Sequence, residues 1–203
     1  MEYKHIIRNK ITIMPNADDG QINELLSLIK GKEDGQDKLV CFTKISPKPI
    51  TLKTDSIEED NWLLNNWGTR NKAFNTCWAS DNEIIFDTEW HPSIPIFCKI
   101  VKMLPHINLT FTWASDKAGV NTGTIYSNNG NLDVKTYSDF SKMAYETGFE
   151  LRPAYRQIYT YNDKIGSYEY DISDFIHIAK EKGVYKDTDG SKYQLLKTDD
   201  LPF

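Results

Sequence analysis

The chain has 203 residues, of which 39% are hydrophobic, 12% aromatic and 26% charged, and its formal net charge is −5. Such a chain can bury a sizeable core without metal or disulfide staples, and it has no apolar stretch near the ~20 residues of a membrane-spanning helix. The acidic balance disfavours broad electrostatic binding to nucleic acid or anionic lipid. Because the N-terminus has no signal-like hydrophobic region, we expect a cytoplasmic protein without membrane association.

The first three elements follow from hydrophobic periodicity. Alternating side chains predict a half-buried strand over residues 6–13. Apolar residues at helical spacing then predict a helix that Asp18 or Asp19 caps and Gly31 ends. This spacing is set by Ile22, Leu25, Leu26 and Ile29. A charged loop leads to the apolar run 39–45, which we interpret as a second strand.

A capping box and two short apolar runs organise the next part of the chain. Ser56 and Glu59 have the spacing of a capping box, so a short helix is expected to follow. Gly68 would end this helix in a left-handed conformation. Residues 74–79 and 83–90 then favour two strands of a hairpin. The buried side of the short helix would carry Leu63, Leu64 and Trp67.

Prolines in the segment 91–95 favour the start of a third helix, because a missing N–H costs little in the first turn. Its apolar side would be formed by Phe97, Ile100, Val101 and Leu104. Residues 108–115 predict a further strand. The Asn-Gly turn in 128–131 predicts a hairpin between 124–127 and 132–136.

The C-terminal part has a different character. A helix bearing Phe140, Met143 and Ala144 is expected to end at Gly148, and a Tyr-rich stretch covers 155–170. Another helix is predicted after Ser173. We therefore divide the chain into an α+β domain, 1–149, and a Tyr-rich helical appendage, 150–203, packed on that core.

The order of these elements predicts an α+β fold with a mainly antiparallel sheet. Within it lies a βαββαβ series, which is typical of the ferredoxin-like arrangement. In that arrangement both helices cover one face of the sheet, and the other face is free for a ligand or partner. The extra β-hairpin and the C-terminal helical appendage would be additions to this body.

Two tryptophan motifs carry a family resemblance. Residues 61–73 fit W-x-x-x-x-WGT-[KR]-x-x-A, and residues 85–95 contain FDT-x-W-x-P-x-x-P. Together they resemble the YubB-type ferredoxin-like domain family of conjugative plasmids and phages, over roughly residues 5–150. The resemblance implies a fold and a mobile-element origin, but no biochemical activity. The chain departs from the family pattern at Glu89 and His91, and its tail beyond residue 150 has no counterpart.

The cysteines give no sign of a metal or redox centre. Cys41, Cys77 and Cys98 are odd in number and widely spaced, which argues against a disulfide framework and against a CxxC pair. We expect each to be a buried thiol, and we predict no cofactor. The name of the family refers to a fold and not to an iron–sulfur cluster.

Asp87, Glu89 and His91 would point to the same face of a strand, because side chains alternate with period two. Two carboxylates and an imidazole so placed could bind a divalent metal or share acid–base chemistry. The alternative is a solvated edge beside a buried Phe86, Thr88 and Trp90 face. We favour this second interpretation, and we place these three residues in a binding surface.

Aromatic and cationic residues offer further binding candidates. Trp62 and Arg70 are expected at the surface, whereas Trp67 and Trp90 are expected in the core. Phe111 and Trp113 could form a base-stacking platform, although ordinary sheet burial is the favoured interpretation. In the tail, a contact surface is expected from Arg152, Tyr155 and Arg156.

No catalytic motif stands out, so we favour a protein that is not an enzyme. The leading hypothesis is a phage or mobile-element accessory protein that binds a host or element protein complex, including one that itself binds nucleic acid. It would inhibit a host defence system, as an anti-CRISPR-like or other anti-defence protein. The acidic segment 55–60, or the edge formed by Asp87 and Glu89, would supply complementary charge. The alternatives are a nucleotide or single-stranded nucleic-acid binder that uses the open sheet face, and a metal-dependent hydrolase.

Overall fold

The computed structural model of the chain describes residues 5–15, 17–33 and 35–170. The chain divides into two compact units, Met1–Leu151 and Arg152–Phe203, and each is described by itself. The helix predicted after Ser173 lies outside the described residues. Within the described part of the chain, no helix is long and apolar enough to cross a membrane.

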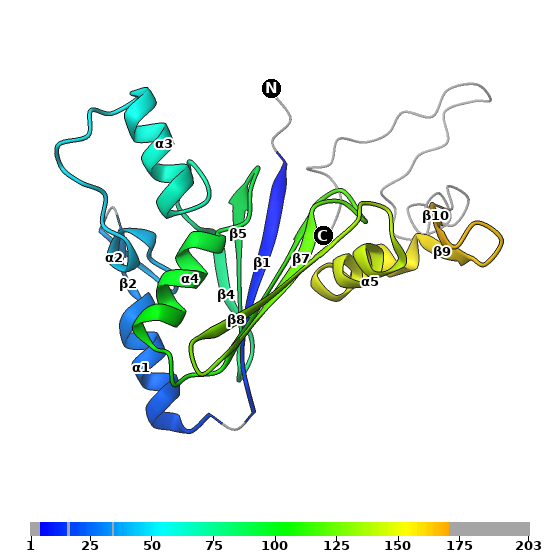
Figure 1. Cartoon of the computed structure of the whole chain (residues 1–203), viewed down its shortest axis with the longest axis horizontal. Helices are drawn as coiled ribbons and strands as arrows, with labels where there is room; N and C mark the ends of the chain where they lie inside the picture. The colour runs from blue at the N-terminus through cyan, green and yellow to red at the C-terminus, as the bar shows by residue number, and fades with distance from the viewer. Residues whose placement is uncertain (1–4, 16, 34, 171–203) are drawn as a thin grey trace. The chain divides into compact units, whose positions relative to one another are not determined.

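The first unit is built on a six-stranded antiparallel sheet (Figure 1). Its strands are β1 (Ile6–Ile13), β4 (Phe74–Ser80), β5 (Glu83–Glu89), β6 (Leu109–Ser115), β7 (Thr122–Asn128) and β8 (Asn131–Tyr137). They lie in the order β4-β5-β1-β6-β7-β8. The two helices of the core series are α1 (Asp19–Ile29) and α4 (Ile94–Met103). The series β1-α1-β4-β5-α4-β6 with β1 between β5 and β6 confirms the ferredoxin-like α+β fold, and the predicted hairpin β7-β8 extends the sheet beside β6.

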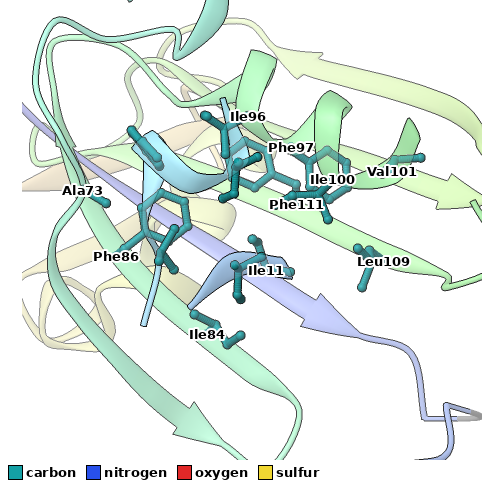
Figure 2. Packing of buried hydrophobic residues seen from close by; sticks show 14 of the residues in the cluster. Ile11, Ala73, Ile84, Phe86, Ile96, Phe97, Ile100, Val101, Leu109 and Phe111 are labelled. Carbon is teal, nitrogen blue, oxygen red and sulfur yellow. The ribbon is translucent and has the colours of Figure 1, made fainter. Parts of the chain in front are cut away.

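The space between sheet and helices holds the hydrophobic core (Figure 2). Ile11 and Phe86 come from the sheet, and Phe97 comes from α4. Phe97 stacks on Phe111 with ring centroids 5.0 Å apart and an interplanar angle of 16°. Phe42 meets Phe86 edge-on at 6.0 Å. The alternation predicted for β1 therefore places its isoleucines at the centre of the molecule's first unit.

The segment between α1 and β4 differs from the prediction. The charged loop contains a small hairpin of β2 (Gly31–Glu33) and β3 (Gln36–Lys38), and the strand predicted over 39–45 is wrong. Its last residues form the short helix α2 (Phe42–Ile45). Both neighbouring positions of β1 are already taken by β5 and β6, so the sheet centre has no place for this segment. A short apolar run alone cannot distinguish a strand from a buried helical turn.

The second helix of this insertion, α3 (Ile57–Asn66), begins as predicted at Ser56. The Ser56 hydroxyl accepts a hydrogen bond from the Glu59 backbone N–H at 3.1 Å. The Glu59 carboxylate does not return to Ser56 in the way a capping box requires. It accepts instead from the Asp55 backbone N–H at 2.6 Å and from the Lys48 amine, and these contacts lower the pKa of Glu59.

A fifth helix, α5 (Lys142–Leu151), lies on the opposite side of the sheet from α1 and α4 (Figure 1). It packs against β6, β7 and β1, so the face expected to be free is partly covered. The helix continues past Gly148, where we predicted its end. Tyr145 and Phe149 are buried, whereas Phe140 and Met143 are 48% and 50% exposed.

The thiols also differ from the expectation that all three are buried. Cys41 is buried, Cys98 is partly exposed, and Cys77 is exposed on β4. β4 is an edge strand of the sheet, which explains the exposure of Cys77. All three cysteines are free.

The described part of the second unit is a tyrosine hairpin. A 3-10 helix, η1 (Pro153–Gln157), precedes β9 (Tyr159–Asn162) and β10 (Ser167–Tyr170). Tyr159 lies opposite Tyr170, and Tyr161 lies opposite Tyr168. The ring centroids of these two pairs are 5.4 Å and 5.1 Å apart. The Tyr-rich composition of this stretch therefore stabilises a short two-stranded sheet through cross-strand aromatic pairs.

Lys10 links α5 to the sheet. Its side chain is buried and donates to Glu83 at 2.8 Å and to Glu150, on α5, at 2.5 Å. Burial alone would lower the pKa of Lys10, but the hydrogen bonds and charges of Glu150 and Glu83 outweigh it, and the pKa is raised. The ammonium group thus holds two carboxylates from separate elements.

We predict that Lys10→Met lowers the free energy of unfolding by about 2 kcal/mol near pH 8, because two hydrogen bonds to a charged group are lost. The contribution is complete below the ordinary pKa of 10.5 and is lost as the pH rises through the higher pKa of the folded state. Urea unfolding of both proteins from pH 8 to pH 12 should therefore show the difference narrowing above pH 10.5. A constant difference would contradict this assignment, and Lys102→Met, on an exposed position of α4, is the control.

Candidate functional site

The two tryptophan motifs meet at the end of β5. Gly68 follows α3 with φ +81°, and a Cβ at this position would lie 2.6 Å from the Pro92 carbonyl oxygen and 2.7 Å from Cδ of Pro95. The Thr69 hydroxyl donates to the Glu89 carbonyl at 2.9 Å. Only glycine allows both the positive φ and this close approach. The turn after α3 is thereby fixed against the segment that follows β5.

A buried network of polar side chains holds the segment after β5 in place. The Asn9 side-chain amide donates to the Thr88 hydroxyl at 2.9 Å and to the Phe86 carbonyl at 3.3 Å. The Asn9 oxygen accepts from the Ser93 backbone N–H at 3.3 Å. Thr88 in turn donates to the His91 carbonyl at 2.8 Å. Asn9, Thr88 and Ser93 are all fully buried, so these bonds satisfy the Asn9 amide, the Thr88 hydroxyl and the Ser93 backbone N–H, whereas the buried Ser93 hydroxyl has no hydrogen-bond partner among the described residues.

Trp90 sits in a strained turn at the top of this network. Its φ is +67°, and the His91 N–H donates to the Glu89 carbonyl at 2.8 Å, which closes a γ-turn around Trp90. The Trp90 N–H donates to the His5 carbonyl at 2.8 Å, and the two rings meet edge-on at 5.2 Å. A positive φ is a genuine outlier for so bulky a residue, and the surrounding contacts keep it in place.

The prediction that Trp90 belongs to the core is wrong, because its side chain is 40% exposed. β5 ends at Glu89, so the alternation of the strand no longer applies at residue 90. The γ-turn then directs the indole outward. By contrast, the core prediction for Trp67 is confirmed: it is 4% exposed, and its indole N–H donates to the Ser46 carbonyl at 2.8 Å.

Asp87, Glu89 and His91 do not form one cluster. Asp87 is 2% exposed and accepts from Arg8 at 3.0 and 3.2 Å and from Asn75 at 3.1 Å. Glu89 is half-buried and accepts from Asn71, whereas His91 lies beyond the end of the strand and is exposed. Among the described residues, no group of three or more His, Cys, Asp or Glu side chains could hold a metal ion. The solvated edge we favoured is also inaccurate at Asp87, which Arg8 neutralises in the interior.

The remaining candidates of the first unit lie around the end of α3. Arg70 is exposed and pairs with Asp60, with 3.3 Å between Nε and Oδ2. Trp62 is partly buried against the core, where its ring meets Trp67 edge-on at 5.8 Å. Lys99 lies 5.9 Å from the centre of the Trp62 ring. Trp62 thus contributes to the packing of α3 on α4 more than to an open surface.

Phe111 and Trp113 face the helices and not the second side of the sheet. They are 0% and 2% exposed, and Trp113 covers Gly123, where an added Cβ would lie 2.3 Å from its ring. The favoured interpretation of sheet burial is therefore confirmed for both. No stacking platform is formed by these two residues.

The candidates of the tail belong to the second unit. Tyr155 and Arg156 lie on η1, and Arg152 precedes it as its N-cap residue. Arg156 is exposed, while Arg152 and Tyr155 are half-buried.

We define the tryptophan corner as Trp90, His5, Glu89 and Asn71, which the contacts above bring together at the surface. Sequence reasoning missed His5 and the supporting role of Asn9. A signal for Asn9 was present, because it is a polar residue on the isoleucine side of β1. Such a residue is buried only if its amide is satisfied, which predicts a local network.

The comparison with family models agrees with this fold. Residues 66–161 match the family model described as a ferredoxin-like domain in Api92-like protein. The match covers just under half of the chain and supports a ferredoxin-like domain family. It contains the WGT turn and the whole Asp87–Ser93 segment, while β1 and α1, which complete the strand order, precede it. Neither the curated proteins nor the solved structures gave a match.

We predict that Gly68→Ala destabilises the protein by about 3 kcal/mol, because it adds a steric clash to the cost of a positive φ. Gly35→Ala is the matched control: Gly35 has φ +80°, but an added Cβ would meet nothing within 4 Å. It should cost only about 1 kcal/mol. Urea denaturation measures both. If both substitutions lowered the free energy of unfolding equally, the close contact with Pro92 would make no contribution to the cost of Gly68→Ala.

Proposed function

We propose that this protein is a non-enzymatic binding protein that docks on a protein partner through the tryptophan corner. The observation that carries the proposal is the exposed indole of Trp90 held in a γ-turn. Large aromatic residues dominate the energetics of protein interfaces, and Trp is among the most enriched residues at hot spots. A strained, over-determined aromatic at a surface is better explained by recognition than by packing.

The rigidity of the corner supports this function energetically. Ordering a side chain at an interface costs roughly 0.5–1.5 kcal/mol. The edge-on contact with the His5 ring restricts the Trp90 side chain before binding, so part of this cost is avoided, and the γ-turn and the Asn9 network fix the backbone that carries it. A partner pocket would therefore meet an aromatic group that is preorganised for binding.

Flanking polar groups would give the interface its specificity. We propose that Arg70, Glu89 and His91 lie in the contact surface around Trp90, and that Asp87 and Trp62 act indirectly by supporting it. In the predicted acidic segment, Glu59 is paired with Lys48 and Asp60 with Arg70. The exposed acids Asp55 and Glu58, with the net charge of −5, favour a partner with a basic surface.

We further propose that the partner is a host or mobile-element protein complex built to receive nucleic acid, and that binding inhibits a host defence system. This rests on the acidic charge and on the resemblance of the two tryptophan motifs to YubB-type domains of plasmids and phages. It implies action in the cytoplasm of a host cell. Arg152, Tyr155 and Arg156 would add a second contact surface from the appendage 150–203.

We predict that Trp90→Ala weakens partner binding at least about thirtyfold, which corresponds to the 2 kcal/mol threshold of a hot spot. The measurement is affinity capture from nuclease-treated host lysate, followed by titration of the captured protein. Trp78→Ala is the matched control, because Trp78 is 38% exposed on β4 and lies outside the corner. It should bind like the wild type.

Retention of the captured protein by Trp90→Ala would sink the proposal, as would equal loss with Trp78→Ala. Capture of nucleic acid alone, abolished by the nuclease, would do the same. Circular dichroism of both variants checks that the fold is intact.

A further inference from the structure

The strand β8 is an exposed edge of the sheet. Among the described residues it pairs with β7 only, and six of its seven residues are exposed. Leu132 and Val134 are 40% and 55% exposed, although both are apolar. An edge strand presents main-chain N–H and C=O groups that can pair with another strand.

The two edges of the sheet are unlike each other. β4, at the other edge, pairs with β5 through two register shifts, between Phe74 and Cys77 and between Trp78 and Ser80. Such bulges hinder the addition of a further strand. β8 pairs with β7 over seven consecutive residues without a shift. The sheet therefore has one irregular edge and one regular edge that can accept a strand.

The turn at the start of β8 shows which groups point outward. Asn129 and Gly130 have φ +48° and +78°, as in a type I′ turn, and they connect the paired residues Asn128 and Asn131. A two-residue turn closes on a hydrogen-bonded pair, and such pairs alternate with non-hydrogen-bonded ones. The main-chain groups directed away from β7 therefore belong to Leu132, Val134 and Thr136.

The charges of β8 are self-complementary. Asp133 and Lys135 lie on one face, with 3.8 Å between their charged groups, and they are the only charged residues of the strand. Consider two copies of β8 aligned antiparallel with Val134 opposite Val134. Asp133 of each copy then lies opposite Lys135 of the other, at the closely spaced non-hydrogen-bonded positions.

We propose that the protein forms a two-fold symmetric dimer in which β8 of one copy pairs with β8 of a second copy about Val134. The sheet then continues from one copy into the other. The main-chain N–H and C=O groups of the two Val134 residues form a hydrogen-bonded pair on the symmetry axis. Leu132 of each copy lies opposite Thr136 of the other. Lysine on an edge strand usually opposes pairing, but here Asp133 leaves β8 without net charge. The interface is isologous and separate from the tryptophan corner.

The test uses sedimentation equilibrium of the full chain from about 1 µM to about 1 mM, the range in which such a contact is measurable. Wild type should show a concentration-dependent dimer. D133K places like charges opposite each other twice, and K135D does the same with the opposite sign. Each variant alone should dimerise at least about tenfold more weakly.

The decisive arm mixes the two variants. In a pair of one D133K chain and one K135D chain, every charge again faces its opposite, so the heterodimer should regain the wild-type affinity. K102D, with the same change in net charge as K135D but on an exposed residue of α4, should dimerise like the wild type. V134P should abolish pairing and keep the fold, since its lost N–H points away from β7.

A wild-type protein that stays monomeric over the whole range would overturn the proposal. A dimer that survives both charge reversals, or a mixture that fails to associate, would overturn the β8 register. Circular dichroism distinguishes these outcomes from unfolding of a variant.

Discussion

The contact between Gly68 and Pro92 is the constraint on which the upper end of the first unit depends. It joins the end of α3 to the segment after β5, two parts of the chain that no strand pairing connects. Thr69 adds a hydrogen bond to Glu89, and Trp67 extends the contact to Ser46 beside α2. The insertion between α1 and β4 is thus held to a ferredoxin-like core through one glycine turn. The two tryptophan motifs of the sequence thus meet in one contact.

The buried hydrogen-bond network of Asn9 restricts the conformation of the turn at Trp90. Burying Asn9, Thr88 and Ser93 without partners would be strongly unfavourable. The side-chain amide of Asn9 binds both ends of the turn and so restricts its backbone conformation. The strained φ of Trp90 is tolerated for the same reason, and the indole is left at the surface. The same network therefore accounts both for the backbone conformation of the turn and for the exposed indole on which the proposed recognition rests.

Most of the fold could be predicted where local chemistry and tertiary packing agree. The alternation of β1, the cap at Asp18 and the Asn129-Gly130 turn each specify one conformation locally, and the structure has all three. Prediction failed where packing against distant parts of the chain decides the local conformation. The run 39–45 is apolar enough for a strand, but both positions beside β1 are occupied by β5 and β6, and the last residues of the run form α2.

The candidate site could be predicted only in part, again because some of its structure depends on contacts between separate parts of the chain. Its segments could be found from the motifs, and Gly68 could be assigned to a left-handed turn. The exposure of Trp90 could not, because it depends on a γ-turn that is held by the carbonyl of His5 and by the side-chain hydroxyls of Thr69 and Thr88. No local sequence pattern indicates these bonds. Asp87 was expected at an edge, yet its position opposite Arg8 in the β1-β5 register places it in a partly buried ion pair.

We infer that Trp90 is held rigidly at the surface before any partner binds. Backbone and indole ¹⁵N relaxation of the free protein tests it most directly. We expect an order parameter near 0.85 for the Trp90 amide, as in rigid backbone, and a similarly restricted indole N–H. An order parameter below about 0.6 at Trp90 would contradict the claim, because the aromatic side chain would then have to be ordered on binding.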